Sequence, residues 1–582
     1  KTWDWISSKP HVNMLLEELN EAKTYEDWQE TALRLDQHLD NDLWRRAPIG
    51  PHFDSRLIID RAEALNEAIE VDDSEEVEAI FRASLLRNLG NITNTNLFSV
   101  AFAGTKITID QFVRSMCLAI RYFAALPTQN STGMTAQEKM DLMHDSRQAY
   151  GRTALLLQGG AIYGLCHFGI VKALHLRGLL PRIVIGQGIG ALVAALVCIH
   201  REQELAPFLD CETSILSSFG TSEESSSTDI LSRMVDPVLS TLRKVEKSHQ
   251  RYNLEGNVLG VDILERLVQT HIGDLTFQEA YDRTKRVLNI TVYTPEARDS
   301  PTLLNYLTAR DVLIRSAAIA SNTSSVNVER PAILLCKNEH GDIVPWRKRT
   351  GDNEPLASER HNPSLRQNPR PLQRVAQLFN VNHFVVSQPR PYLAPYLRSF
   401  IPQQNSTSQR SYFTSALSPI STITSPAFKL VSAELHHRLA QLDLFGLLPS
   451  LPRRLLLDEQ IPGSYITLSP ELTFSDLTKL LDSPSTRQEL DYWILKGERT
   501  VWPNIAALKV RCAIEVELDR AYQLVRIFSA GMGGASAAAK QDQMDEGADD
   551  EDALLIASTN RERVAVPRLT SASTMTFKAK ER

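Results

Sequence analysis

Apolar and polar residues follow a helical period through the first part of the chain. In residues 108–123, "TIDQFVRSMCLAIRYF", apolar residues recur at steps of three and four, which places them on one face of a helix. The segment 24–39, "TYEDWQETALRLDQHL", begins with Thr24 and has Asp27 three residues later, which is a helix-start signal. The run 74–92 predicts a further helix that ends at Gly90. The predicted buried face of 108–123 consists of Ile109, Phe112, Val113, Met116, Ile120 and Phe123.

These patterns predict a helical N-terminal domain over residues 1–140, either a cap on a neighbouring domain or a helical stalk without chemistry. From Thr153 onward the pattern changes to short apolar runs separated by helical segments, which is typical of an α/β domain with a mostly parallel sheet. We place this domain at 150–400, with polar insertions near 217–229 and 347–371. The predicted strands are "TALLL" (153–157), "RIVI" (182–185), "VLNITVYT" (287–294), "AILLC" (332–336) and "HFVVS" (383–387).

The C-terminal part is predicted in three pieces. Residues 402–426 are rich in Ser, Thr and Pro and predict a linker, 427–526 return to helical patterning, and 527–582 predict a disordered acidic tail. The net charge of −7 is local, because the run 541–552, "QDQMDEGADDED", holds acids and no base. The rest of the chain is close to neutral, which argues against nucleic acid as a partner.

The six cysteines are scattered without a C-x-x-C pair, which excludes a cysteine zinc site and favours reduced thiols in a cytosolic compartment. Because the chain begins with Lys1 rather than Met, we expect the natural N-terminus, with any targeting signal, to lie upstream.

The stretch 181–199, "PRIVIGQGIGALVAALVCI", fits three motifs. Gly186, Gly188 and Ala191 match the dinucleotide-binding pattern G-x-G-x-x-A, but the region about 20 residues further on lacks the strand and acid that such a site needs. A membrane-spanning helix over 183–199 would be at the short limit of length. The third interpretation is a nucleophile elbow, G-x-S-x-G, with glycine in place of serine.

In this third interpretation Gly186 and Gly190 are the two elbow glycines, and Gly188 stands at the centre. Upstream, "LLLQGGAIYGLCHFGIVKAL" predicts a strand, a glycine-rich loop and a helix. Such a loop presents backbone N–H groups that can stabilise an oxyanion. The order strand, loop, helix, strand, elbow and helix within about 50 residues favours the third interpretation.

These stretches make the sequence similar to the patatin-like phospholipases, and more narrowly to the fungal and plant patatin-like triacylglycerol lipases with a helical N-terminal domain. The similarity extends from about residue 3 to residue 520. It implies a patatin-like three-layer α/β/α domain, together with the helical N-terminal domain and a helical C-terminal segment. The matching stretches are "RNLGNI", "GTK", "GGAIYGLCHFGIVKALHLRGLLPRIVIG", "GDIVPW", "LQRVAQLFNVNHFVVSQPRP" and "LKGERTVWPNIAALKVRCAIEVELD".

The resemblance implies a Ser–Asp dyad in which serine attacks an ester carbonyl and aspartate acts as its base, with no cofactor and no metal. By this resemblance the nucleophile position falls on Gly188 and the acid position on Pro363, and Asp352 is a possible displaced acid or a solvated loop carboxylate. Neither a G-x-S-x-G nor a D-G pair occurs anywhere in the chain. The family's oxyanion loop keeps Gly159, Gly160 and Gly164, whereas its first glycine is Gln158.

The family dyad needs no histidine, so His167 and His383 are predicted to pack or hydrogen-bond. No histidine is followed five residues later by Asp, so an H-x-x-x-x-D acyltransferase motif is absent.

We therefore expect a catalytically impaired patatin-like protein that binds lipid, a lipid surface or an active homologue. The alternative is an active triacylglycerol or phospholipid ester hydrolase that uses a displaced acid and an unrecognised nucleophile. We expect no dinucleotide to bind. The resemblance implies a cytoplasmic protein, peripheral on lipid droplets or associated membranes. The segments 433–457 and 390–400 are candidate lipid-surface segments or ordinary core helices.

Overall fold

The computed structural model of the chain describes most of residues 2–541 and divides into two units, 1–525 and 526–582. The description below concerns the first unit, apart from the end of the last helix. The described ranges are 2–126, 134–159, 164–209, 268–292, 302–323, 333–346, 371–388, 461–470 and 487–541, with a few single positions between 434 and 476.

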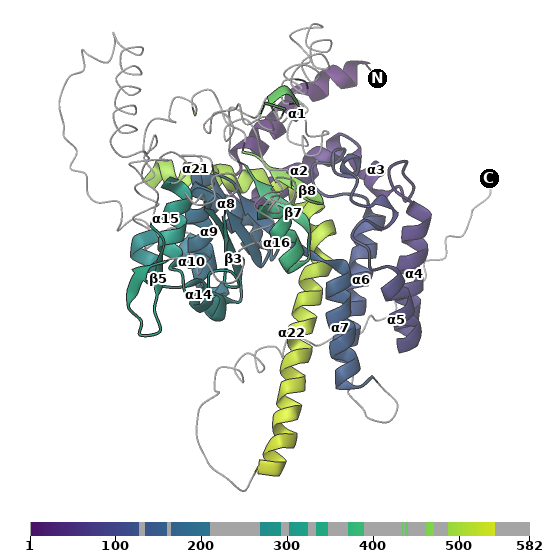
Figure 1. Ribbon diagram of the computed structural model, residues 1–582. Coiled ribbons are helices and arrows are strands. Elements are labelled where there is room, and N and C mark those ends of the chain that lie inside the picture. The colour runs from purple at the N-terminus through teal and green to yellow at the C-terminus, as the bar shows by residue number, and fades with distance from the viewer. Residues whose placement is uncertain are drawn as a thin grey trace, which may run out of the picture. The chain divides into compact units, whose positions relative to one another are not determined.

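The N-terminal region is helical, as the periodicity predicts (Figure 1). Thr24 caps the second helix by accepting a hydrogen bond from the Asp27 amide at 3.2 Å, and the six predicted core residues of 108–123 are all buried. Its elements are α1 (Thr2–Glu21), α2 (Tyr25–His38), α3 (Asn41–Arg46), α4 (Ser55–Val71), α5 (Ser74–Ala83), η1 (Leu89–Asn91), η2 (Thr95–Phe98), α6 (Ile107–Ala125) and α7 (Ala136–Tyr150).

The helix predicted over 74–92 is shorter than expected. α5 ends at Ala83, and Gly90 has φ +54, outside the right-handed helical region. In the segment that follows the helix, Arg87 donates hydrogen bonds to the carbonyls of Gly151 and Arg511.

A six-stranded sheet of order β4-β3-β2-β1-β7-β8 forms the centre of the α/β domain. Every neighbouring pair is parallel except β3 with β4, which confirms the predicted mostly parallel sheet. In register, Leu157 lies opposite Gly186 of β2 and Ser387 of β7, so the carboxyl ends of three strands meet at one edge. The strands are β1 (Arg152–Leu157), β2 (Ile183–Gly186), β3 (Val287–Val292), β4 (Thr302–Leu304), β7 (Val381–Ser387) and β8 (Ser464–Leu468).

Two strands differ from the prediction. The run 332–336 was expected in the main sheet, but β5 (Leu335–Lys337) pairs antiparallel with β6 (Ile343–Pro345) in a separate two-stranded sheet. Leu335 bonds to Leu313 and Ser316 at the start of a helix, and the neighbouring Leu334 is buried. The sixth strand, β8, comes from the segment predicted to be helical.

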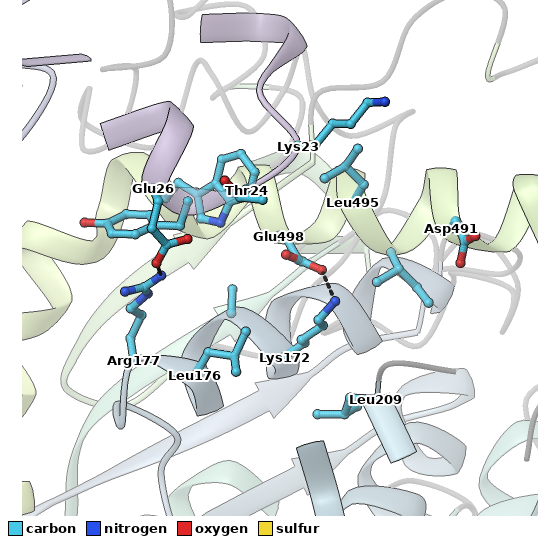
Figure 2. Close-up of a pocket in the computed structure, with 14 residues that line it drawn as sticks. Lys23, Thr24, Glu26, Lys172, Leu176, Arg177, Leu209, Asp491, Leu495 and Glu498 are labelled. Atoms are coloured by element: carbon cyan, nitrogen blue, oxygen red, sulfur yellow. Dashed lines mark hydrogen bonds and ion pairs between the residues drawn. The ribbon is translucent and has the colours of Figure 1, made fainter. Parts of the chain in front are cut away.

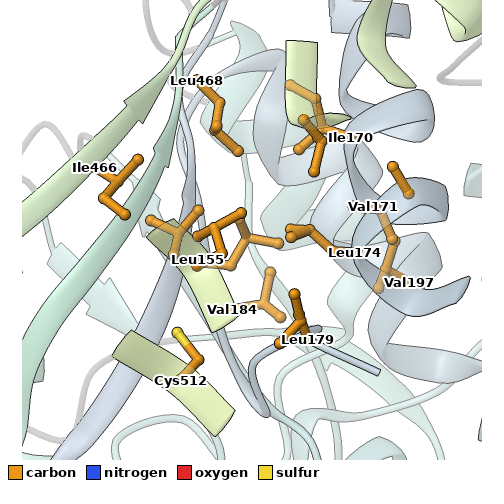
Figure 3. Packing of buried hydrophobic residues seen from close by; sticks show 14 of the residues in the cluster. Leu155, Ile170, Val171, Leu174, Leu179, Val184, Val197, Ile466, Leu468 and Cys512 are labelled. Carbon is orange, nitrogen blue, oxygen red and sulfur yellow. The ribbon is translucent and has the colours of Figure 1, made fainter. Parts of the chain in front are cut away.

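Helices cover both faces of the sheet. Leu155 and Leu157 of β1 belong to the large core cluster with α8 and α9, whereas Ala154 and Leu156 face a smaller cluster with α16. Figure 3 shows Leu155 among Leu174 of α8, Ile466 of β8 and Cys512 of the last helix. The helices are α8 (Cys166–Leu176), α9 (Ile189–Ile199), α10 (Glu202–Leu209), α14 (Phe277–Thr284), α15 (Ile314–Thr323), α16 (Pro371–Phe379), α21 (Arg487–Val501), η9 (Trp502–Asn504) and α22 (Ile505–Gln541).

Residues 505–525 of α22 join the N-terminal helices to the α/β domain (Figure 1). Three ion pairs connect this helix to the N-terminal region, with nitrogen–oxygen distances of 3.1, 2.7 and 2.6 Å. α22 continues to Gln541, past the predicted boundary at residue 526. The pairs are Arg87–Glu515, Arg121–Glu517 and Arg147–Asp519.

Candidate active site

The elbow predicted from the glycines is present between β2 and α9. Gly186 ends the strand, and Gly188, with φ +58 and ψ −125, is the N-cap of the helix. The following helix, Ile189–Ile199, is buried at every position, because all eleven residues are apolar or glycine. This 11-residue core helix also explains why the stretch 183–199 resembles a membrane span in composition. Among the described helices, none is both long enough and apolar enough to cross a membrane.

The space available for a side chain differs among the three elbow glycines. A Cβ on Gly186 would lie 2.4 Å from the Ala191 Cα, and one on Gly190 would lie 2.1 Å from the Leu157 carbonyl oxygen. Both positions therefore require glycine. At Gly188 the nearest atom to an added Cβ is the Gly159 Cα at 3.6 Å, an ordinary contact. The elbow thus has space for a side chain at its central position, although the positive φ disfavours one.

The two described ends of the glycine-rich loop after β1, Gly159 and Gly164, lie against the elbow. A Cβ on Gly159 would be 3.6 Å from the Gln187 carbonyl oxygen and 4.0 Å from the Ile189 amide nitrogen. A Cβ on Gly164, at the far end of the loop, would lie 2.3 Å from the Ile189 side chain. The structure therefore brings both ends of the predicted oxyanion loop to the start of α9.

Of the predicted site residues, the structure brings together Gly159, Gly164, Gly186, Gly188 and Gly190. Gly160, Asp352 and Pro363 lie outside the described residues, so their predicted roles stay predictions. The candidate lipid-surface segment 390–400 and almost all of 433–457 lie outside them as well.

Ser321 anchors the elbow. The Gly188 amide donates a hydrogen bond of 3.0 Å to the Ser321 Oγ, and that hydroxyl donates to the Thr291 carbonyl at 2.7 Å. Ser321 belongs to α15 and is buried, so this contact ties the elbow to the end of β3. The sequence did not predict this residue, because Ser321 lies more than 100 positions from the elbow along the chain.

His167 and Ser387 form a second missed contact, beside the glycine-rich loop. The His167 Nε2 lies 2.7 Å from the Gln158 carbonyl oxygen, and its Nδ1 lies 2.6 Å from the Ser387 Oγ. Because a carbonyl can only accept, Nε2 carries the proton and Nδ1 accepts from the hydroxyl. Burial lowers the pKa of His167 to about 4, so the ring is neutral near pH 7. As predicted, His167 forms hydrogen bonds within the core.

The chemistry of this arrangement follows from its groups. The elbow amides of Gln187, Gly188 and Gly190 already donate hydrogen bonds, to the Leu157 carbonyl, the Ser321 Oγ and the Gln187 carbonyl. The hydroxyls next to them, on Ser321 and Ser387, are buried and already donate hydrogen bonds. Among the described residues there is no cluster of His, Cys, Asp or Glu that could hold a metal ion.

A hollow of about 430 Å³ lies elsewhere, between the start of α2, α8 and α21 (Figure 2). Two ion pairs line it: Lys172 to Glu498 at 3.0 Å and Arg177 to Glu26 at 2.5 Å. None of its lining residues belongs to the elbow or the glycine-rich loop, so it is separate from the candidate active site.

The mostly parallel sheet, the strand–elbow–helix turn and the loop ends that lie against it define an α/β protein with a nucleophile-elbow turn. Residues 155–326 match the family model "Patatin-like phospholipase", and residues 5–148 match "Domain of unknown function (DUF3336)". The chain belongs to the patatin-like phospholipase family, and several of its relatives are named triacylglycerol lipases. The predicted family is confirmed.

Three relatives illustrate the similarity. Triacylglycerol lipase ptl1 of Schizosaccharomyces pombe is 32% identical over 86% of this chain and 83% of its own length. Triacylglycerol lipase 3 of Saccharomyces cerevisiae is 28% identical over 88% of this chain and 89% of its own length. Triacylglycerol lipase SDP1L of Arabidopsis thaliana is 30% identical over 86% of this chain and 57% of its own length.

Proposed function

We propose that this chain is a lipid-binding or regulatory homologue of the triacylglycerol lipases that does not itself hydrolyse esters at a useful rate. The observation that carries the proposal is Gly188 at the centre of the elbow. Ester hydrolysis by the dyad begins with attack of a serine oxygen on the acyl carbonyl, and glycine has no atom that can attack. Loss of the nucleophile from such a unit lowers kcat by on the order of 10⁶.

The retained scaffold supports binding. The glycine-rich loop still lies against the elbow, with a Cβ on Gly159 only 4.0 Å from the Gly188 Cα. Both elbow glycines that permit this packing are kept. We infer that this region binds an acyl ester without hydrolysing it. The partners we propose are a lipid or lipid-droplet surface and an active homologue, with the protein cytoplasmic and peripheral on that surface.

A second candidate function is ester hydrolysis through another nucleophile. The pair Ser387–His167 favours it, because a serine hydroxyl and a neutral histidine nitrogen lie 2.6 Å apart beside the loop. Against it, both side chains are completely buried, so a substrate carbonyl has no access to the Ser387 Oγ in this structure.

Release of fatty acid from triolein and from lysophosphatidylcholine by the purified protein tests the proposal. We expect no release above that of heat-treated protein. Activity that disappears in Ser387→Ala or in Asp352→Asn would support the second candidate and refute the proposal. Conversely, we expect Gly188→Ser combined with Pro363→Asp to introduce measurable hydrolysis, because the elbow has space for the serine side chain.

A further inference from the structure

Three buried residues beside the glycine-rich loop form a closed set of hydrogen bonds. The Gln158 amide donates to the Ser387 carbonyl at 3.1 Å, and the Ser387 hydroxyl donates to the His167 Nδ1 at 2.6 Å. The His167 Nε2 donates to the Gln158 carbonyl at 2.7 Å, which closes the set. We call these three residues the hydrogen-bonded triangle.

The triangle joins the ends of three elements. Gln158 directly follows β1, Ser387 is the last residue of β7, and His167 is the second residue of α8. The bond from His167 to Gln158 therefore connects residues on either side of the glycine-rich loop. Because both backbone groups of Gln158 are bonded, the next residue, Gly159, is fixed relative to β7 and α8.

The position of Gly159 decides how much space the elbow has at its centre. The Gly159 Cα is the nearest atom to a Cβ built on Gly188, at a distance of 3.6 Å. A shift of Gly159 toward or away from the elbow would narrow or widen this space. The triangle thus acts on the elbow through one backbone position.

Histidine and serine are costly residues to bury. An imidazole ring and a hydroxyl lose their hydrogen bonds to water when they leave the surface, unless the protein replaces those bonds. In the triangle both ring nitrogens of His167 and the hydroxyl of Ser387 have partners. A buried polar network whose members are all bonded holds its residues in one arrangement. Apolar side chains would serve packing alone, whereas fixing the Gln158 carbonyl requires a donor.

We propose that His167 is a positioning residue for acyl-ester binding: through the triangle it holds Gly159 against Gly188. This inference rests on the proposed function, because the ligand is the acyl ester proposed above. His167 does not have to touch that ligand, since it acts on the site through the Gln158 carbonyl.

Positioning and catalysis make different demands on His167. A positioning residue needs an N–H group that reaches the Gln158 carbonyl, and a carboxamide can supply one. A catalytic base for Ser387 needs a nitrogen that takes up a proton, which a carboxamide lacks. His167→Gln therefore separates the two roles, because its amide nitrogen stands in for Nε2. His167→Asn is one methylene shorter and falls short of the carbonyl.

Titration of the full-length protein with the methyl ester of cis-parinaric acid, followed by fluorescence, tests the inference. We expect His167→Gln to bind this ester within about threefold of the unmodified protein. His167→Asn should raise the Kd about tenfold, the loss of one hydrogen bond to a buried carbonyl. Adding Ser387→Ala to His167→Asn should weaken binding no further, because both residues belong to one network.

His383→Asn is the matched control. His383 is also completely buried and lies in β7, but its printed partner is Thr153 at the start of β1. We expect this variant to lose stability, measured by urea denaturation, and to keep its affinity for the ester. An equal loss of affinity in His383→Asn and His167→Asn would show that binding follows stability in general, and would overturn the inference.

The other outcomes separate the two proposals. Unchanged binding by His167→Asn would overturn the positioning role and leave ester binding intact. No binding by the unmodified protein would refute ester binding and the positioning role together. Hydrolysis of the ester that is lost in His167→Gln would assign the residue to catalysis instead.

A measurement on the unmodified protein does not depend on how the variants fold. NMR of protein labelled at the histidine nitrogens reports which ring nitrogen carries the proton, and the His167→Gln spectrum identifies the His167 signals by their absence. We expect the proton on Nε2 and a bare Nδ1. A proton on Nδ1 would contradict the triangle.

Discussion

At the scale of single residues, the three elbow glycines have different reasons for being glycine. We expect Gly188→Ser to lower the free energy of unfolding by about 1–3 kcal/mol, the cost of a side chain at positive φ, because the site has room for it. Gly190→Ala should cost more, about 3 kcal/mol or above, since its Cβ would overlap the Leu157 carbonyl. Urea denaturation of both variants measures the difference. Equal costs would contradict the packing described for the elbow.

His167 makes stability depend on pH. Burial lowers the pKa of His167 to about 4 from an ordinary value of 6.5. Above pH 6.5 the ring is therefore neutral in both the folded and the unfolded protein, and its full contribution to the free energy of unfolding is present. As pH falls from 6.5 to 4, the unfolded chain takes up a proton that the folded chain does not. Up to about 3 kcal/mol of the free energy of unfolding is lost as a result. Burial also lowers the pKa of His383, so His167 accounts for only part of the total decline.

Urea denaturation between pH 4 and 7 measures this slope. We expect His167→Asn to reduce the loss of unfolding free energy over that range, whatever its stability at pH 7. His144→Asn is the matched control, because the His144 side chain is 57% exposed. A slope unaltered in His167→Asn would mean that the ring becomes protonated in the folded protein.

At the scale of secondary-structure elements, Arg87 connects the N-terminal helices to β1 and α22. Its guanidinium group bonds to Thr153 at 3.1 Å and to Glu515 at 3.1 Å, and the Arg87 side chain is 9% exposed. Arg87→Met would leave the Glu515 carboxylate, which is only 14% exposed, without its cation, so we expect a loss of unfolding free energy of about 3 kcal/mol by urea denaturation. Arg82→Met removes an exposed pair with Glu78 and should change stability by less than about 1 kcal/mol.

The elements that the sequence predicts well are those whose burial is periodic along the chain. The α6 face from Ile109 to Phe123 could be predicted because each turn of one helix contacts the same core. The run 332–336 could not be assigned to a sheet, because a short apolar run has the same pattern whether a strand or a helix covers it. Likewise, β8 pairs with β7 across more than 70 residues, and pairing at that separation leaves no local signal.

The residues of the candidate site likewise fall into those that the sequence could predict and those that it could not. Gly186 and Gly190 could be predicted because the elbow requires glycine at fixed positions in one short motif. The contacts of Ser321 and Ser387 with the elbow and loop could not, because each joins residues more than 100 positions apart. A buried serine at a strand or helix end has no sequence pattern that reveals its partner.

At the scale of the whole molecule, the N-terminal helices and the α/β domain share one core. A single cluster of buried apolar residues runs from Ala22 in the N-terminal region to Val525 in α22 and includes both β1 and β8. Residues 1–525 accordingly form one compact unit. The N-terminal region therefore contributes to the stability of the sheet in addition to any role it has in binding.

A shared core of this kind predicts one cooperative unfolding transition for residues 1–525. We expect differential scanning calorimetry of the full chain to show one main endotherm, and near-ultraviolet circular dichroism to change at the same temperature. A chain that begins at residue 150 would expose the apolar side of α22 and lose its ion pairs with Arg87, Arg121 and Arg147, so it should lack a cooperative transition. Two separate endotherms, or a folded chain from residue 150, would show that the N-terminal helices are an independent domain.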